Sequence, residues 1–327
     1  MISEASPKKT SHALRESRIP VELAGQRFDQ ALARLFPEYS RSRLSQWIKD
    51  GHALLDERPA RPRDAVMGGQ HVSLQVVDEP LTGVEPEDLP LDIVYEDQDL
   101  IIVNKPAGLV VHPGAGNRAG TLQNALLHHA PELLNVPRCG LVHRLDKDTS
   151  GLLAVARTLE SHTRLVAALQ AREFEREYVA LTNGVMTGGG TVDAPLGRHA
   201  TDRLRMSVRE GGREAVTHYR VLKRFRAHTL VAVQLETGRT HQIRVHLAHI
   251  RYPIVCDPVY GRRLALPPGA TPRLKEALQG FRRQALHAKR LGLAHPVSGE
   301  QMHWEAPLPE DMQELVAALE DDADHAR

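Results

Sequence analysis

The sequence lacks the features of several protein classes. Its two cysteines, Cys139 and Cys256, stand in no Cys-x-x-Cys or His-x-Cys spacing, which argues against a disulfide framework and a structural zinc site. No apolar run approaches the roughly eighteen residues of a membrane-spanning helix, and no apolar signal segment follows the N-terminus. We therefore expect a cytoplasmic protein without a membrane partner.

The sequence also has no large excess of charge of one sign, because its formal net charge is +1. The charged residues are, however, unevenly distributed along the chain. Residues 310–327 contain seven acidic residues and one basic residue, which leaves +7 for residues 1–309. Between residues 198 and 226, nine Lys or Arg stand against three Asp or Glu. Such a run is usually a solvated face, but it also suits contact with the phosphate backbone of a nucleic acid.

Length and composition indicate a globular chain with two domains. A chain of 327 residues can bury one large core and a smaller one, and 41% hydrophobic with 25% charged residues is typical of globular proteins. There is no internal repeat. We predict a flexible polar tail over residues 1–18, a small domain over 19–80, a linker with Pro and Glu over 81–90 and a large domain over 91–327.

The small domain begins with two predicted helices. Apolar residues recur at helical spacing over residues 28–36, before a proline, and over residues 44–48, before a glycine. Ser40 or Ser42 is suited to cap the second helix. Short segments with strand character follow near residues 52–55 and 71–77.

The large domain mixes strands and helices without regular alternation, which predicts an α+β fold rather than a doubly wound sheet. The segments with strand character are 100–103, 179–181, 216–221, 229–235 and 291–294. The segments with helical character are 121–129, 158–170, 240–250 and 311–319.

Residues 141–153 are the most informative part of the chain. They place Asp146 between apolar runs that should be buried, with the pair His143-Arg144 before it and a Thr-Ser-Gly turn after it. Ionising a carboxylate there costs free energy unless a cation lies nearby. Such a placement suits chemistry, but an isolated Asp more often caps a turn or pairs with a neighbour such as Arg144, so this segment alone does not decide between the two roles.

Two other interpretations of this segment disagree with its spacing. Asp146, Asp148 and Ser150 match the first half of a calcium-binding loop, but the loop's final position should be a bidentate Glu and is Arg157. A phosphate-accepting aspartate usually ends an uninterrupted apolar strand, whereas a charged pair interrupts this one. No second acidic constellation suggests a magnesium site.

Four motifs together resemble one enzyme family. The sequence HRLDKDTSGL over residues 143–152 resembles the signature of the RluA-type pseudouridine synthases. The sequences NKPAGLVVHPG (104–114), REYVAL (176–181) and TGRTHQIRVH (237–246) resemble the family's other motifs in order and spacing. The likeness extends from about residue 19 to about residue 312. RQALHA (283–288) and EAPLPEDM (305–312) carry a narrower likeness to members that modify large-subunit ribosomal RNA.

The resemblance implies a fold and a reaction. The implied fold is a small S4-like RNA-binding domain followed by a pseudouridine synthase domain with a long mixed, mostly antiparallel sheet. The reaction breaks the C1′–N1 bond of a uridine, turns the base and joins C1′ to C5, after the nucleotide has left its stack. Because nothing is oxidised and no group leaves, the resemblance implies no cofactor and no metal.

The resemblance also implies roles for individual residues. Asp146 aligns with the catalytic aspartate, Arg244 with the arginine that pairs with it, and Tyr178 with the tyrosine that stacks on the base and moves a proton. Arg144 aligns with the residue that fills the place of the flipped base. We also place three residues in contact with the substrate: His143, Arg239 and His241. The implied RNA-binding residues of the small domain are Arg41, Arg43, Lys49, Arg58, Arg61 and Arg63.

Other candidate sites are weaker. His241, His246 and His249 have helical spacing, but no Asp, Glu or Cys completes a metal site, so RNA contact or helix packing is expected of them. A glycine-rich stretch at 114–119 imitates a dinucleotide-binding loop, but a proline interrupts the strand that must lead into it. Cys139 near His143 suggests a thiol nucleophile, but no third orienting group is evident.

The sequence departs from the family pattern at two positions. Cys256 stands where the family usually has Gly, and Arg251 stands where a smaller residue is common. We expect Cys256 to crowd a close backbone contact and Arg251 to add a phosphate contact.

The expected function is that of a cytoplasmic isomerase acting on uridines of 23S large-subunit ribosomal RNA. The implied target is the loop of helix 69, either in free RNA or within the assembling subunit, and a monomer is the default expectation. Two alternatives remain open: a synthase of the same family acting on transfer RNA or other ribosomal uridines, and a non-catalytic RNA-binding or ribosome-assembly protein. The presence of Asp146, Tyr178 and Arg244 disfavours the latter.

Overall fold

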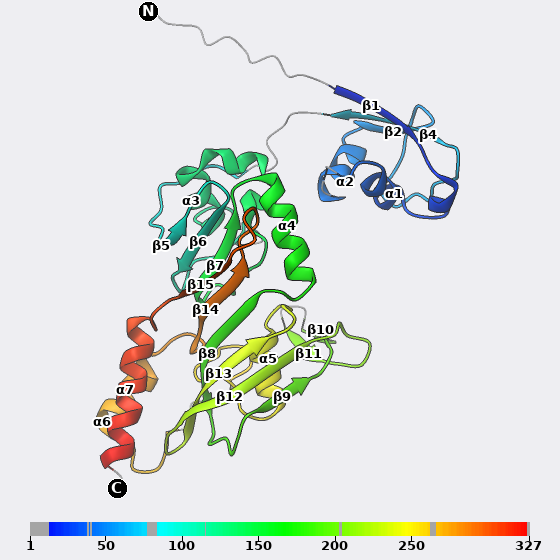
Figure 1. Ribbon diagram of the computed structural model, residues 1–327. Coiled ribbons are helices and arrows are strands. Elements are labelled where there is room, and N and C mark those ends of the chain that lie inside the picture. Colours follow the sequence, from blue (N-terminus) through cyan, green and yellow to red (C-terminus); the bar gives the residue numbers. More distant parts are fainter. Residues whose placement is uncertain are drawn as a thin grey trace, which may run out of the picture. The chain divides into compact units, whose positions relative to one another are not determined.

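The computed structural model describes residues 13–37, 39, 41–76, 84–114, 116–202, 205–261 and 266–325. The chain forms two compact units, the N-terminal unit Met1–Gly83 and the C-terminal unit Val84–Arg327 (Figure 1). Residues 1–12 of the predicted tail, the candidate cap Ser40, the end of the predicted strand at residue 77 and residues 81–83 of the predicted linker lie outside the described residues.

The N-terminal unit packs two helices with a four-stranded antiparallel sheet. The strands are β1 (Ala13–Arg18), β2 (Ala53–Leu55), β3 (Arg58–Pro59) and β4 (His71–Val76), in the order β1-β4-β2-β3. The helices are α1 (Phe28–Leu35) and α2 (Arg41–Lys49), which follow a 3₁₀ turn, Val21–Leu23. Their apolar positions meet the sheet in one core, which includes Phe28, Leu32, Leu44, Ile48, Val72 and Leu74.

Two expectations for this unit are wrong. The predicted tail includes residues 13–18, but these form β1 and pair with β4 over its whole length. The strand is polar because it lies at the edge of its sheet and is largely exposed, so it shows no apolar alternation. Ser42 lies within α2, which begins at Arg41, and so does not occupy the position before the helix.

A nine-stranded mixed sheet forms the frame of the C-terminal unit. Its order is β5-β6-β7-β14-β8-β13-β12-β9, and β15 pairs with β14. Among the described strands every neighbouring pair is antiparallel except β7 and β14, which run parallel. This confirms the predicted α+β class with a long, mostly antiparallel sheet.

The strands of this sheet are β5 (Ile93–Glu96), β6 (Leu100–Lys105), β7 (Ser150–Ala156), β8 (Glu175–Asn183), β9 (Gly190–Asp193), β12 (Val216–Arg224), β13 (His228–Leu235), β14 (Leu286–Ala294) and β15 (Gln301–Glu305). A separate hairpin consists of β10 (Leu196–Arg198) and β11 (Met206–Val208). The helices are α3 (Leu122–His129), α4 (Leu159–Gln170), α5 (Gln242–His249), α6 (Pro272–Gly280) and α7 (Glu310–His325), with 3₁₀ turns at Pro131–Asn135 and Pro137–Gly140. No helix in the described ranges is both long and apolar enough to cross a membrane.

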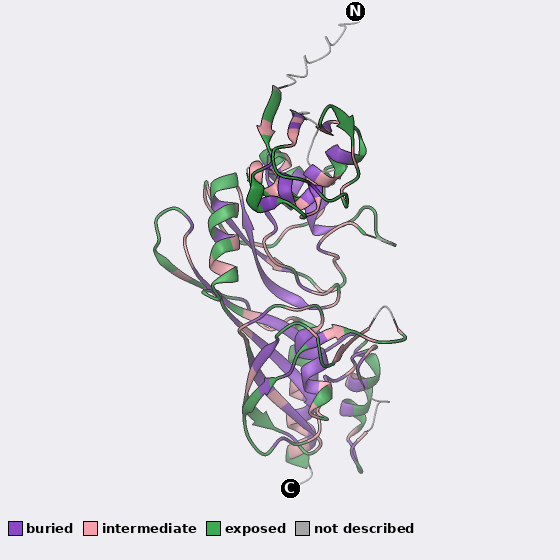
Figure 2. Cartoon of the chain, turned by 90° about the vertical axis from the view of Figure 1, so that its right-hand side faces the viewer, coloured by how far each residue is buried: buried purple, intermediate pink, exposed green. Residues whose placement is uncertain are grey.

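Both faces of the sheet are covered, as alternation along β6 shows. Ile101 and Val103 belong to a large core that also contains apolar residues of α3, α5, α6 and α7. Leu100 and Ile102 belong to a second core, with Leu165 of α4. Successive strand residues point to opposite faces, so a strand covered on both sides becomes a continuous apolar run. Figure 2 shows the resulting band of buried residues along the central strands.

Residues 84–90, predicted as part of the linker, belong to the C-terminal unit. The Asn124 side chain at the start of α3 donates to the Glu85 carbonyl at 2.8 Å. The Glu87 carboxylate accepts a hydrogen bond from the Gly120 amide at 2.9 Å. Composition suggested a linker because the segment is polar and proline-rich, but its backbone and carboxylate are used to complete a helix N-terminus.

The two departures from the family pattern lie at left-handed backbone positions. Arg251 has φ +71 and Cys256 has φ +56. Arg251 ends α5 in a Schellman arrangement, in which its amide donates to the Ala248 carbonyl and the Tyr252 amide donates to the Leu247 carbonyl. Glycine adopts this conformation without strain, which explains a preference for small residues at both positions.

Replacing Arg251 by Gly is expected to raise the free energy of unfolding by about 1 kcal/mol. The change removes the steric strain of a left-handed non-glycine residue at a position where glycine is the usual helix end. Urea unfolding of both proteins measures this difference. Arg251→Ala is the control, because alanine keeps the Cβ atom and the strain; equal stability of all three proteins would contradict the prediction.

Candidate active site

The segment that carries Asp146 is fixed at each end by a glycine. Gly140 has φ +76, and a Cβ atom there would lie 1.9 Å from the Ala156 carbonyl oxygen. Gly151 has φ +114, and a Cβ atom there would lie 2.2 Å from the Ala288 carbonyl oxygen. Because only glycine fits at either end, the loop between them is held against the middle of the sheet.

Contacts with β14 and with Gln284 just before it hold the turn that follows Asp146. The Thr149 amide donates to the Asp146 carbonyl at 3.1 Å, which closes the turn. The Thr149 hydroxyl accepts a hydrogen bond from Gln284 at 3.1 Å, and the Ser150 hydroxyl bonds the His287 ring at 2.9 Å. The carboxylate of Asp146 remains accessible, with 17% of its side chain exposed.

Arg244 on α5 joins two carboxylates. Its Nη1 donates to Asp146 Oδ2 at 2.9 Å, while its Nε and Nη2 donate to the two carboxylate oxygens of Asp257 at 2.7 and 2.9 Å. Burial alone would lower the pKa of the guanidinium, but hydrogen bonds and charges from both carboxylates raise it. The side chain of Asp257 is fully buried; burial raises its pKa, but Arg244 and two backbone amides lower it overall. Asp257 thus orients a permanent cation that offers one further donor to Asp146.

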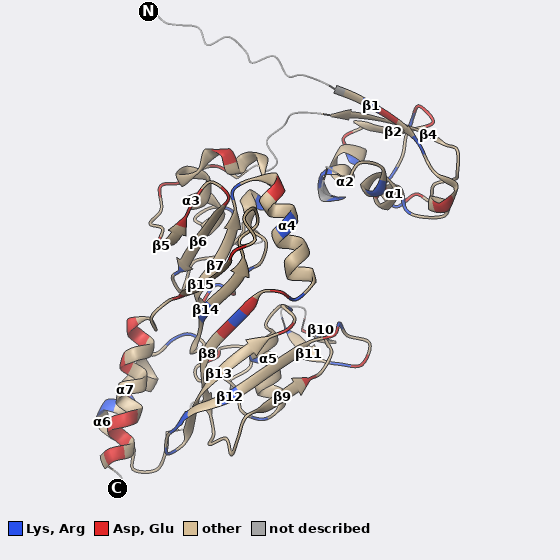
Figure 3. Cartoon of the chain, in the orientation of Figure 1, with Lys and Arg blue, Asp and Glu red and all other residues tan. Residues whose placement is uncertain are grey.

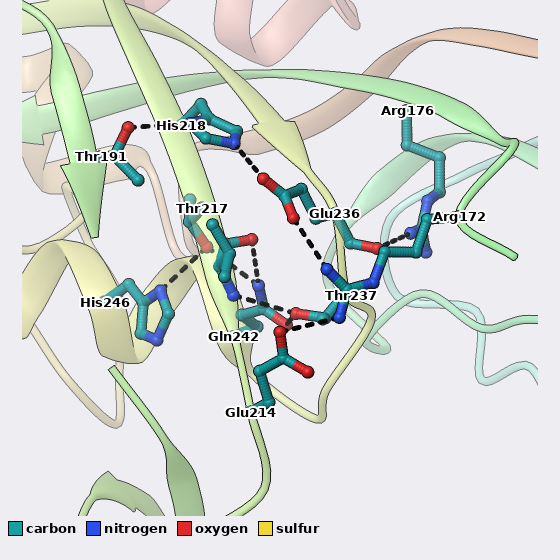
Figure 4. A network of polar contacts seen from close by, with 11 residues as sticks. Arg172, Arg176, Thr191, Glu214, Thr217, His218, Glu236, Thr237, Gln242 and His246 are labelled. Carbon is teal, nitrogen blue, oxygen red and sulfur yellow. Dashed lines mark hydrogen bonds and ion pairs between the residues drawn. The ribbon is translucent and has the colours of Figure 1, made fainter. Parts of the chain in front are cut away.

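A buried network around Gln242 fixes the helix that carries this cation (Figure 4). The Gln242 side chain donates to Thr217 Oγ1 at 3.0 Å and accepts from Thr237 Oγ1 at 2.8 Å and from the Arg239 amide at 2.9 Å. Thr217 Oγ1 also bonds His246 Nδ1 at 2.9 Å. One amide side chain therefore joins the turn at residues 237–241, strand β12 and helix α5.

His246 serves helix packing. It is fully buried, its second ring nitrogen bonds the Ala194 carbonyl oxygen at 2.9 Å, and burial lowers its pKa. Both nitrogens are occupied, so the alternative expectation of RNA contact is wrong for this residue.

A cavity of about 470 Å³ opens beside the Asp146–Arg244 pair. Its lining combines these charges with apolar side chains such as Leu235 and Ile243 and with Tyr178 from β8. Burial raises the pKa of the Tyr178 phenol, the charge of Arg176 opposes this and that of Asp146 adds to it. The phenol is therefore neutral at neutral pH, and the cavity offers a planar aromatic ring close to a carboxylate.

His241 lies near Asp146, but farther from its carboxylate than Arg244 does. Its Nδ1 is 2.7 Å from the Tyr260 hydroxyl, which itself accepts a hydrogen bond from the Met206 amide at 2.8 Å. The hydroxyl proton is therefore assigned to the bond with Nδ1, so the neutral imidazole carries its proton on Nε2. That nitrogen lies 3.9 Å from Asp146 Oδ1. Burial lowers the pKa of His241 and the charge of Asp146 opposes this, while its φ of +57 marks local strain.

The remaining predicted substrate residues line the same cavity. His143 accepts a hydrogen bond from the Ala154 amide at 3.0 Å, and burial lowers its pKa to about 3, so it is a neutral ring held by β7. Arg144 is exposed and makes no hydrogen bond or ion pair within the described part of the chain. Arg239 donates to the Glu214 carbonyl at 3.0 Å. All seven residues predicted from the sequence for catalysis and substrate contact thus meet at one cavity.

Sequence reasoning missed the residues that position this set. Asp257 and Tyr260 follow the departure at Cys256 in one short motif, and their polar types in a buried stretch were the available signal. Lys105 is another residue that positions the site. It is completely buried, and its Nζ donates to three backbone carbonyls at 2.7 to 2.9 Å, one of them the carbonyl of Lys147. Burial lowers the pKa of Lys105 to about 7. It ties the motif at residues 104–114 to the segment of Asp146.

The six predicted RNA-binding residues belong to the N-terminal unit. All are exposed except Arg43, which is half-buried and stacks on Trp47 with its guanidinium carbon 4.6 Å from the ring centre. Arg41 is tied to the buried Asp29 of α1 at 2.9 Å. Arg41, Arg43 and Lys49 lie on α2, and Arg58, Arg61 and Arg63 lie on β3 and the loop after it (Figure 3).

One group of described residues has a spacing suited to a metal ion. Ligand atoms of Asp97, Asp99 and His295 lie within 4.8 Å of one another. Their carboxylates already accept hydrogen bonds: Asp97 from the Tyr95 hydroxyl, and Asp99 from the Ser161 hydroxyl. Hydrogen bonding explains the group as a brace between a hairpin and α4, and the expectation of no metal stays a prediction.

Comparisons with known proteins point in one direction. A family model described as RNA pseudouridylate synthase matches residues 99–249. A protein of Xanthomonas campestris pv. campestris named ribosomal large subunit pseudouridine synthase D is 57% identical over 325 residues, which covers 99% of this chain and 98% of that protein. The protein of the same name from Escherichia coli K12 is 55% identical over 299 residues, with 91% and 92% covered.

Solved structures also resemble this chain. Human RNA pseudouridylate synthase domain containing 4 has a TM-score of 0.56 and 27% identity, and the match covers 70% of this chain and 92% of that one. Human RNA pseudouridylate synthase domain containing 1 has a TM-score of 0.52 and 25% identity, with 72% and 98% covered.

Proposed function

Because this chain belongs to the RNA pseudouridylate synthase family, we propose that it isomerises uridines of large-subunit ribosomal RNA to pseudouridine. The observation that carries the proposal is the cavity in which Asp146, held by Arg244, lies with Tyr178. The names of the relatives, which match over nearly their whole length, support large-subunit RNA as the substrate. We extend this to the loop of helix 69 as target.

The reaction requires a carboxylate close to C1′ of the sugar while the bond between C1′ and N1 breaks. Asp146 fills this role, and the Arg244 guanidinium, whose Nη1 donates to Asp146 Oδ2 at 2.9 Å, orients the carboxylate and balances its charge. The electron pair of the broken bond stays with the ring, and the new bond forms between C1′ and C5. A proton leaves C5 and another is taken up at N1, so the sum is an isomerisation.

The aromatic ring of Tyr178 suits the detached base, which must turn without leaving the cavity. Arg144 at the exposed edge of the cavity suits the gap that a flipped nucleotide leaves in its stack, because a planar guanidinium can stack on neighbouring bases. His143, Arg239 and His241 complete the lining around the nucleotide.

The N-terminal unit resembles an S4 RNA-binding domain in sequence, and its α1, α2 and four-stranded sheet agree with such a domain. Its exposed cations (Arg41, Lys49, Arg58, Arg61 and Arg63, together with Arg43) would contact phosphates and add affinity without reading the sequence. Neither Cys139 nor Cys256 forms a disulfide, which fits a reducing cytoplasm.

The proposal is tested by tritium release from RNA labelled at C5 of uridine. Large-subunit ribosomal RNA and assembling large subunits are expected to release tritium, whereas transfer RNA is expected to release none. Sequencing of the product then locates the modified positions. Tritium release from transfer RNA alone would show that transfer RNA, and not ribosomal RNA, is the substrate. Tight RNA binding without tritium release from any RNA would favour a non-catalytic assembly protein.

A further inference from the structure

Arg176 is a buried cation that the proposed roles do not use. It lies on β8 two residues before Tyr178, and alternate residues of a strand point to the same face. Its residue is only 7% exposed, and burial lowers its pKa. Both side chains line the cavity that holds Asp146.

No carboxylate of the described residues lies within ion-pair distance of Arg176. Its Nε has no hydrogen-bond partner, and its Nη2 reaches the Glu236 carbonyl oxygen only at 3.5 Å (Figure 4). Arg244, by contrast, forms ion pairs with two carboxylates. Burying a guanidinium without a counterion is unfavourable, and the cost is normally offset by an ion pair or a ligand. Among the described residues this counterion is missing.

The guanidinium is directed toward the turn that carries Thr237. A Cβ atom on Gly238 would lie 2.8 Å from Arg176 Nη1, so the absence of a side chain at residue 238 leaves room for the cation. Thr237 and Gly238 line the same cavity. The Arg176 side chain therefore lies among the residues that a nucleotide bound in the cavity would contact.

We propose that Arg176 donates a hydrogen bond to a carbonyl oxygen of the flipped uracil and stabilises the negative charge that the ring gains when the C1′–N1 bond breaks. This inference rests on the proposed function. As that bond breaks, its electron pair moves into the ring and the charge is shared by the two carbonyl oxygens. C1′ is held by the Asp146 carboxylate, and the charge disappears again when C5 bonds C1′, C5 loses its proton to water and N1 takes one up.

The depth of Arg176 favours the base over a phosphate. A flipped nucleotide reaches the pocket with its base, while its phosphates stay with the RNA chain at the mouth, where the exposed Arg144 lies. The uracil of the substrate is neutral and becomes charged only during reaction. A donor that is unpaired beforehand thus gains most in the transition state, which is the condition for a faster chemical step.

The experiment compares wild type with Arg176→Met, which keeps the length of the side chain and removes its charge and donors. Arg164→Met is the matched control, since Arg164 lies on α4 with half of its side chain exposed and pairs with Glu160. We expect kcat for tritium release to fall roughly 10²–10³-fold in Arg176→Met. The RNA dissociation constant should change less than about threefold, and its dependence on salt should stay the same. The midpoint of thermal unfolding should not fall, because an unpaired buried charge is removed.

Each other outcome contradicts the inference in a recognisable way. A salt slope lower by about one with unchanged kcat would identify a phosphate contact instead. A lower unfolding midpoint, with activity lost in proportion to the unfolded fraction, would identify a structural role. Unchanged kcat in Arg176→Met with active wild type would contradict this inference alone. An inactive wild type on every RNA would contradict the proposed function, and this inference with it.

Discussion

Tritium release from uridine-labelled ribosomal RNA is expected to fall by roughly 10³-fold or more when Asp146 is replaced by Asn, because the charge that faces the sugar is lost. The substitution preserves volume and leaves an oxygen that can accept from Arg244 Nη1. Arg244 keeps its two bonds to Asp257, so α5 stays in place. RNA affinity should therefore remain within about threefold of the wild-type value, since binding and chemistry use different groups.

Asp148→Asn is the matched control for this prediction. It makes the same chemical change two residues away in the same segment, on a side chain that does not line the cavity. Single-turnover release with saturating enzyme separates the chemical step from binding. Comparable losses in the two variants would show that the segment needs its charges for structure, and an active Asp146→Asn would remove the carboxylate from the proposed mechanism.

The second large effect concerns stability. Arg244→Met is expected to lower the free energy of unfolding of the C-terminal unit by about 3–5 kcal/mol at neutral pH, because Asp257 becomes a buried charge without a counterion. Urea unfolding of the full chain measures this change. Fluorescence can follow both units, since the two tryptophans lie one in each, Trp47 and Trp304. Arg273→Met, which removes an exposed pair with Asp321, should cost less than about 1 kcal/mol.

The pH dependence of this variant follows from the same pair. In wild type Arg244 holds the pKa of Asp257 below its ordinary value. This pair therefore stabilises the fold above the unfolded pKa of about 3.9, and the contribution is lost as the pH falls through the folded value. In Arg244→Met burial raises the pKa of Asp257 instead, so the variant gains stability as the pH is lowered toward 5. A stability loss independent of pH would contradict this account.

The sequence predicts the fold class and the interior strands better than the strand ends. Residues 179–181 were predicted as a strand, but β8 runs from Glu175 to Asn183, because Arg176 is buried and Glu177 half-buried in a stretch that looks polar. Likewise β14 begins at Leu286 and not near 291, since Lys289 and Arg290 interrupt its apolar pattern. Tertiary burial of charged residues is invisible to a local pattern.

For the site, spacing alone would not have joined its parts. Asp146 and Arg244 are 98 residues apart, and a resemblance to family motifs brought them together in the prediction. Asp257 escaped notice because its role depends on the direction of the Arg244 guanidinium, which no pattern encodes. For His246 the sequence allows either RNA contact or helix packing, and only its burial distinguishes these two roles.

Because β7 pairs in parallel with β14, which is synthesised much later, the segment of Asp146 cannot complete its fold until most of the chain has been made. The residues that brace Thr149 and Ser150 come 135 and 137 residues later in the chain. At the usual pace of translation this separation corresponds to a delay on the order of ten seconds. During that time the nascent chain displays Asp146 in a segment that lacks its contacts with Gln284, His287 and Arg244. We therefore expect an unfinished polypeptide to be inactive toward any RNA beside it, including that of the ribosome on which it is made.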